Sequence, residues 1–217
     1  MRTKVLLCAA VLAASLASSM AQNVYSLNVV GYYNVTIPAH ALYMIANQLN
    51  TTNNTLNGVL PNVVDGTQFY HYAGGWNAAS FDGLSLSWDN NYSLAPGEAG
   101  FIKNNDAAPQ VVTFVGEVLQ NTSPGLVNTL PLGLLAARSS MVPQQASLVG
   151  LGIPADDGDQ MYTWGGVNWN PFSFDGLSST WDGADPNGPT ISVGQGFFYK
   201  KSSVGTSSLW VRSFTVQ

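Results

Sequence analysis

The segment SFDGLSLSWD at residues 80–89 places two carboxylates beside a tryptophan, and residues 173–182 repeat it as SFDGLSSTWD. Asp82 and Asp89 therefore recur as Asp175 and Asp182. A pair of carboxylates roughly 5–9.5 Å apart can supply the acid and the base or nucleophile of glycoside hydrolysis. The same residues also suit a hairpin turn, because Asp-Gly is a strong turn dipeptide. We favour the turn, since a structural device is more readily kept in two copies than a whole catalytic centre.

A second repeated feature, a tryptophan followed by an asparagine, is better suited to binding a sugar. Trp76-Asn77 and Trp169-Asn170 both come after a glycine pair. The glycines leave an indole face open, and the amide can donate to and accept from ring hydroxyls. An apolar face beside a convergent polar group is typical of a small-molecule site. We therefore expect one ligand site in each repeat, at Trp76 with Asn77 and at Trp169 with Asn170.

Tryptophan also fills the cores of small β-proteins, because it buries a large apolar area and keeps one polar atom. For Trp88 and Trp181 we expect this core role. Both roles stay open for Trp76 and Trp169, which adjoin glycine-rich turns.

An acidic insertion in the second half carries three oxygen-bearing side chains within six residues, Asp182, Asp185 and Asn187. Calcium takes six to eight oxygen ligands, and the spacing of an EF-hand loop is absent. The insertion is therefore a weak calcium candidate, and a solvated turn is the favoured interpretation. We expect no other cofactor, no firm metal site and no catalytic residue.

The composition excludes several classes of protein. Only 9% of the 217 residues are charged, against about 25% in average soluble domains, and 46% are hydrophobic. Disordered chains have the opposite composition. The formal net charge of −5 disfavours nucleic-acid binding, which uses a basic face.

Residues 1–21 have the pattern of a secretory signal peptide. Arg2 and Lys4 precede the apolar run Val5–Leu16, and small residues end the segment at Ala21. The run is shorter than the ~20 residues that a membrane-spanning helix needs, and no longer one follows. We expect cleavage after Ala21, no transmembrane segment in the mature chain, and a secreted, periplasmic or cell-surface location. The single cysteine, Cys8, would leave with this peptide, so the mature chain would have no disulfide.

The two halves of the chain match in order over most of their length. Besides the segments above, PGE at 96–98 matches VGQ at 193–195, and FIK at 101–103 matches FYK at 198–200. Such self-similarity indicates a tandem duplication. We expect repeat 1 at residues 22–120, a polar linker at residues 121–128, and repeat 2 at residues 129–217.

Each repeat has the periodicity of β-strands. Residues 25–37 alternate apolar and polar side chains, and clusters of Gly, Asn, Asp and Pro separate shorter apolar runs. Only residues 54–60, with their counterpart near residues 147–151, suggest a helical turn. The sequence therefore predicts an all-β protein of two tandem, pseudo-symmetric antiparallel lobes, sandwich or barrel-like, with little helix.

The order of motifs also resembles a known class of module. ALYMIANQLN (41–50), an Asp-Gly before an aromatic strand, a tryptophan, LAPGEAGFIKN (94–104) and TFVGEV (113–118) follow one another. This order is similar to that of secreted bacterial β-modules from Verrucomicrobia-like and related bacteria. Repeat 2 departs from it at ISVGQGFFYKK (191–201), where Val193 replaces the proline. The resemblance implies an exported β-module, and no activity or functional residue is known for the class.

Two functions from different classes follow from these patterns. The first is a non-enzymatic exported protein of the cell surface or extracellular matrix, which binds glycans or builds a layer by self-association through β edges. The second is a polysaccharide hydrolase that uses the repeated Asp pairs, which would require a cleft with two close carboxylates, one of them desolvated. Low charge and abundant Asn, Ser and Thr favour the first function.

Overall fold

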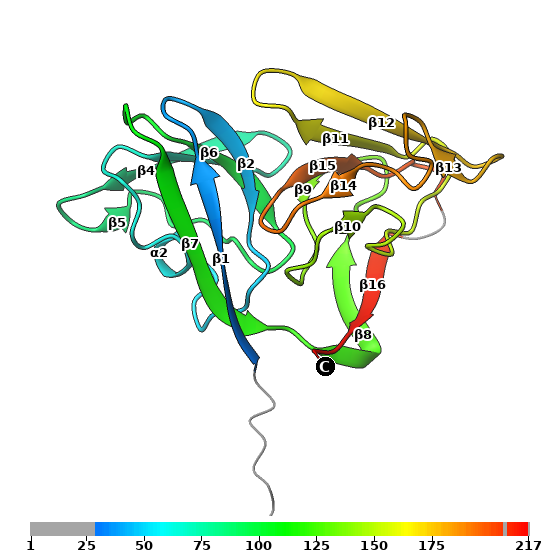
Figure 1. Ribbon diagram of the computed structural model, residues 1–217, viewed down its shortest axis with the longest axis horizontal. Helices are drawn as coiled ribbons and strands as arrows, with labels where there is room; N and C mark the ends of the chain where they lie inside the picture. The colour runs from blue at the N-terminus through cyan, green and yellow to red at the C-terminus, as the bar shows by residue number, and fades with distance from the viewer. Residues whose placement is uncertain (1–28, 206–207, 217) are drawn as a thin grey trace, which may run out of the picture.

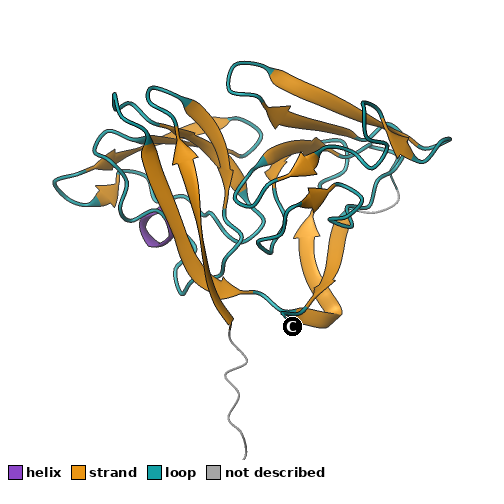
Figure 2. Cartoon of the chain, viewed as in Figure 1, coloured by secondary structure: helices purple, strands orange, loops and turns teal. Residues whose placement is uncertain are grey.

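The computed structural model describes residues 29–205 and 208–216 (Figure 1). The expected signal peptide, residues 1–21, lies outside these ranges. Strands make up nearly all of the regular structure, and the helix α2 (Leu56–Val59) lies where the sequence predicts a helical turn (Figure 2). The prediction of an all-β fold is thus confirmed. Within the described ranges, no helix has the length and apolar character needed to cross a membrane.

The first lobe combines a five-stranded antiparallel sheet with a two-stranded ribbon. The sheet has the order β2-β6-β3-β4-β5, with β2 at Leu42–Ala46, β6 at Ala99–Lys103, β3 at Gln68–Tyr72, β4 at Trp76–Asp82 and β5 at Ser87–Trp88. The ribbon pairs β1 (Val29–Ile37) with β7 (Gln110–Val118). Along β1, Val35 and Ile37 are buried while Val30 and Tyr32 are exposed, as expected for a strand with one solvated face.

The second lobe repeats this architecture with corresponding strands in the same order. Its sheet is β9-β15-β11-β12-β13, with β9 at Leu135–Arg138, β15 at Phe197–Lys200, β11 at Gln160–Trp164, β12 at Trp169–Asp175 and β13 at Thr180–Trp181. Its ribbon pairs β8 (Asn121–Thr129) with β16 (Leu209–Phe214), and a short extra pair joins β10 (Ala146–Ser147) to β14 (Thr190–Ile191). Both five-stranded sheets keep two open ends, so the described strands form sandwich-like layers and not closed barrels.

Residues 121–128 are not a linker, because they form most of β8 and pair with β16. Leu126 is buried while Val127 is half exposed, so this strand packs one face and solvates the other. Polar residues are compatible with a ribbon that has one face in solvent. Gly125 adopts a φ of +98° where the strand bends, a conformation that glycine allows. The connection between the lobes is therefore the short step from β7 to β8 at the bottom of Figure 1.

The hydrophobic core of each lobe lies between its ribbon and its sheet. In the first lobe, Val35 and Phe114 of the ribbon belong to the same buried cluster as Phe69 of the sheet. Trp88 and Trp181 occupy matching positions, with only 4% and 3% of their surfaces exposed. Each packs edge-on against the phenylalanine immediately before the Asp-Gly pair, Phe81 or Phe174, at centroid distances of 5.5 and 5.4 Å. The prediction that these two tryptophans are core residues is confirmed.

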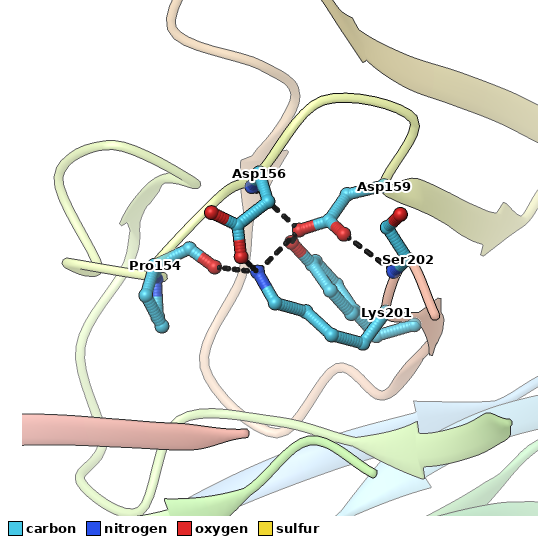
Figure 3. Close-up of polar contacts among 6 residues, drawn as sticks. Pro154, Asp156, Asp159, Lys201 and Ser202 are labelled. Carbon is cyan, nitrogen blue, oxygen red and sulfur yellow. Dashed lines mark hydrogen bonds and ion pairs between the residues drawn. The ribbon is translucent and has the colours of Figure 1, made fainter. Parts of the chain in front are cut away.

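A buried charged cluster distinguishes the second lobe (Figure 3). The Lys201 ammonium, fully buried, donates to Asp159 at 2.7 Å and to the Pro154 carbonyl at 2.6 Å, and pairs with Asp156 at 2.8 Å. Asp159 also accepts the Tyr199 hydroxyl at 2.7 Å. Burial, followed by the hydrogen bond and charge of Asp159, raises the pKa of the Tyr199 hydroxyl, so it remains a donor.

The corresponding position in the first lobe, Asn104, is neutral. Its amide donates to three main-chain carbonyl groups, those of Ile37, Pro38 and Ala108. Equivalent positions of the two lobes therefore differ in chemistry, and of the two residues only Lys201 forms ion pairs.

The lobes meet at their β2 and β9 edges through contacts related by a pseudo-two-fold axis. The Ala46 amide donates to the Gly194 carbonyl, and the equivalent Ser139 amide donates to the Gly97 carbonyl, both at 2.9 Å. Buried Gln48 joins them, since it accepts from the Gly194 amide and donates to the Ser139 hydroxyl. Contacts of this reciprocal kind are typical of symmetric homodimers, and here they join two repeats of one chain.

Glycine is required at both turns that form this interface. Gly97 and Gly194 have φ values of +90° and +76°, a region that other residues rarely adopt. A Cβ atom at Gly194 would lie 2.6 Å from Val35 and 2.8 Å from the Tyr33 ring, both in the first lobe. A Cβ atom at Gly97 would lie 2.5 Å from Asn128 of the second lobe. The Pro-Gly and Val-Gly turns of the two repeats thus insert into the opposite lobe.

We predict that Lys201→Met lowers the free energy of unfolding by about 3–5 kcal/mol, because it leaves Asp159 buried without its cation. Urea denaturation measures the loss. The control is Lys200→Met, the same change at the exposed neighbour, which should cost about 0.5 kcal/mol or less. Similar losses in the two variants would contradict a stabilising role for the buried pair.

We predict that Gly194→Ala destabilises the protein more than Gly152→Ala. Both sites have positive φ and so incur about 1–2 kcal/mol of backbone strain, but a Cβ atom at Gly152 meets nothing within 4 Å. The clash with the first lobe should add about 1–3 kcal/mol at Gly194 alone. Thermal unfolding gives the stabilities, and near-ultraviolet circular dichroism reports the aromatic rings between the lobes. Equal effects on both readouts would show that the Gly194 turn does not hold the lobes together.

Candidate functional site

Six aromatic rings from both lobes gather where the two sheets meet. Trp76 lies 5.5 Å from Phe101 of its own lobe and 5.7 Å from Phe198 of the other lobe, measured between ring centroids. Trp169 repeats the arrangement, at 5.3 Å from Phe198 and 5.6 Å from Phe101. Tyr72 and Trp164 complete the set, stacking edge-on against Phe198 and Phe101. We call this set of six rings, with the pockets beside it, the interlobe site.

Strand alternation places these rings on one face of each sheet. Phe69 of β3 points into the core of the first lobe, so Tyr70 and Tyr72 point to the opposite face, toward the second lobe. Trp76 is paired with Tyr72 across β4 and β3 and therefore shares this face. Trp164 and Trp169 are paired in the same way across β11 and β12.

Two adjoining pockets of about 550 and 590 Å³ lie on either side of the tryptophans. Trp76 and Trp169 line both pockets and are 49% and 37% exposed, whereas Phe101 and Phe198 are buried beneath them. The remaining lining residues correspond between the repeats. They are Leu42, Tyr70, Lys103 and Trp164 in the first pocket, and Leu135, Tyr162, Lys200 and Tyr72 in the second. Each pocket therefore takes residues from both lobes.

Each pocket has an apolar wall and a small polar group at its edge. In the first, the Tyr70 hydroxyl donates to Gln68 at 3.0 Å, and Gln68 lies opposite Lys103 in the sheet. In the second, the Tyr162 hydroxyl donates to Gln160 at 2.9 Å, and Gln160 lies opposite Lys200. A largely aromatic surface with a few fixed polar groups is the usual composition of a small-molecule site.

The structure brings together two of the four predicted ligand-binding residues and separates the other two from them. Trp76 and Trp169, expected to serve one site per lobe, line the same pair of pockets. Asn77 and Asn170 follow them in the strand, so their side chains point to the opposite face. Asn77 is paired with His71, and the Asn170 amide lies 3.5 Å from the Thr163 hydroxyl.

The repeated carboxylates form turns. Asp82 accepts from the Leu84 amide at 2.9 Å and from the Ser85 hydroxyl at 2.9 Å, and Asp175 repeats both contacts with Leu177 and Ser178. These hydrogen bonds hold the pKa of both fully exposed aspartates below its usual value. A general acid for glycoside cleavage needs a raised pKa, so this environment favours the turn over the catalytic interpretation.

In the weak calcium candidate, Asp182 and Asp185 each use one carboxylate oxygen in a loop contact. Asp182 accepts from the Ser173 amide at 2.8 Å, and Asp185 accepts from both the amide and the side chain of Asn187. All three side chains are exposed, and within residues 29–205 and 208–216 no three His, Cys, Asp or Glu residues form a group suited to a metal ion.

Sequence reasoning missed the phenylalanines, tyrosines and lysines of the interlobe site. A signal for them exists, because Phe-x-Lys recurs at 101–103 and 198–200, and Gln-x-Tyr recurs at 68–70 and 160–162. Alternation in a strand places the outer residues of each triplet on one face. In a chain with only seven basic residues, a lysine kept in both repeats is a candidate for function.

Comparison with known proteins gives no family for this arrangement. The chain matches no protein-family model, no curated protein sequence and no solved structure. The function is therefore inferred from the geometry of the interlobe site itself.

Proposed function

We propose that the protein is an exported, non-enzymatic glycan-binding protein and that the interlobe site holds the glycan. The observation that carries the proposal is the pair of half-exposed tryptophans, Trp76 and Trp169. Their rings pack on two buried phenylalanines, Phe101 and Phe198. An exposed indole face is an apolar surface on which the C–H face of a sugar ring can stack. A tryptophan whose only role is packing is normally largely buried, so the exposure of these two indoles favours a binding role.

The polar groups of the site suit hydroxyl-rich ligands. A tyrosine and a lysine line each pocket, and a glutamine is hydrogen-bonded to the tyrosine hydroxyl, so these groups together can donate to and accept from ring hydroxyls. Because the two pockets adjoin and share the tryptophans, the natural ligand is a chain of sugar units that occupies both. Self-association through β edges stays a prediction for the same protein.

A hydrolase using the repeated aspartates receives less support from the geometry. Asp82 and Asp175 sit in equivalent turns of different lobes, and neither lines either pocket of the interlobe site. Their carboxylates are fully exposed, hydrogen-bonded and held ionised, which suits turn formation.

We predict that Trp76→Ala and Trp169→Ala each weaken glycan binding about tenfold, the value of one lost ring-face contact of roughly 1.4 kcal/mol. A glycan array run on the mature protein identifies a ligand, and isothermal titration calorimetry then measures the dissociation constants. The matched control is Tyr32→Ala, which removes an exposed aromatic ring from the outer face of β1 and should leave binding unchanged.

Two outcomes would contradict this proposal. If Tyr32→Ala weakens binding as much as the tryptophan changes, the ligand does not use the interlobe site. If either tryptophan variant lowers the melting temperature by many degrees, the indole is a packing residue and the exposed faces are incidental.

A further inference from the structure

The five basic residues of the described chain fall into two groups. Three have structural roles: Lys201 forms buried ion pairs, Arg138 donates to main-chain carbonyl groups, and Arg212 donates to side chains of its own lobe. The other two, Lys103 and Lys200, line the two pockets of the interlobe site. Both basic side chains of the described chain that have no structural role therefore line the candidate ligand site.

Lys103 and Lys200 are equivalent residues in the two repeats, each the last residue of its strand, β6 or β15. Among residues 29–205 and 208–216, neither ammonium group forms an ion pair with a carboxylate. Each lies on the same strand face as the phenylalanine of its own pocket, two residues earlier. The pseudo-two-fold axis therefore places one unpaired positive charge in each pocket.

The chain as a whole has the opposite charge. Its formal net charge is −5, with twelve acidic residues, yet none of the residues that line the two pockets is acidic. Charges beside apolar walls focus the local potential, so two unopposed lysines create an anion-attracting region on an acidic molecule.

We propose that the ligand of the interlobe site is an acidic polysaccharide, with a uronate carboxylate reaching Lys103 and a second one, further along the chain, reaching Lys200. The proposal rests on the glycan-binding function above, and it adds that the glycan is negatively charged. A polymer whose acid groups recur along its length can satisfy two equivalent pockets at once, whereas a small anion would reach only one lysine.

Single-stranded nucleic acid is the other polyanion that stacks on aromatic side chains. It carries a phosphate on every nucleotide and is normally bound along a continuous basic groove. The pockets of the interlobe site offer only two lysines, on a chain of net charge −5, which fits a ligand of lower charge density. The uronate polysaccharide is therefore the favoured occupant.

The test compares hexagalacturonate with its fully methyl-esterified form, which has the same rings without the charge. Isothermal titration calorimetry of the mature protein should give binding of the free acid at least about fivefold tighter than that of the ester, and this preference should fall at high salt. Lys103→Gln and Lys200→Gln should each weaken binding of the acid about threefold to tenfold and leave binding of the ester unchanged. Lys103→Arg and Lys200→Arg, which keep the charge, should largely retain the preference.

The outcomes separate this inference from the function on which it rests. If acid and ester bind equally and both lose binding in Trp76→Ala and Trp169→Ala, the ligand is not selected for its charge. The proposed glycan-binding function would then still hold. Acid binding that the tryptophan changes do not affect would overturn both. Tighter binding of a thymidine hexanucleotide than of either hexasaccharide would replace the polysaccharide by a nucleic acid and overturn the proposal.

Discussion

Two main-chain hydrogen bonds between the lobes are the constraint on which the interlobe site depends. Ala46 donates to Gly194 and Ser139 donates to Gly97, and the two bonds are related by the pseudo-two-fold axis. They fix β2 against the Gly194 turn of the second lobe and the end of β9 against the Gly97 turn of the first lobe, so a shift of one lobe by one residue would break both bonds together. The apolar cluster between the sheets, which includes Met44, Ala99 and Phe198, then excludes water from them.

This constraint explains why the site is shared and not duplicated. Repeat 1 alone would present Trp76 and Phe101 on an open sheet face, and repeat 2 alone would present Trp164, Trp169 and Phe198. Docking the faces places Trp76 of one lobe against Phe198 of the other, and Trp169 against Phe101. The aromatic surface, the two pockets and the pair of lysines therefore come from the symmetry of the interface. A tandem duplication that keeps a symmetric contact yields such a site in a single chain.

The sequence predicted the parts that depend on local patterns. Alternation identified the strands, the repeated segments revealed the two lobes, and Asp-Gly identified the turns after Asp82 and Asp175. Burial of Trp88 and Trp181 followed from the need of each small lobe for a large apolar side chain. These features depend on residues close in the chain, or on one lobe at a time.

The parts that failed depend on how distant segments pack. Nothing within one repeat shows that Trp76 and Trp169 meet, because this requires the docking of the two lobes. Proximity in sequence predicts Asn77 as a partner of Trp76, but neighbouring side chains of a strand point to opposite faces. Residues 121–128 read as a linker because β8 has a solvated face, and only its pairing with β16 identifies it as a strand.

The most direct test of a single interlobe site is fluorine NMR of the protein labelled with 5-fluorotryptophan, titrated with the proposed glycan ligand. Trp76 and Trp169 line both pockets and Trp164 lines one, whereas Trp88, Trp181 and Trp210 are buried in the lobe cores. If the two lobes form one site, the resonances of Trp76 and Trp169 shift together with one dissociation constant, and those of the three core tryptophans do not move. Separate dissociation constants for Trp76 and Trp169, or shifts confined to the core tryptophans, would contradict a single site formed between the lobes.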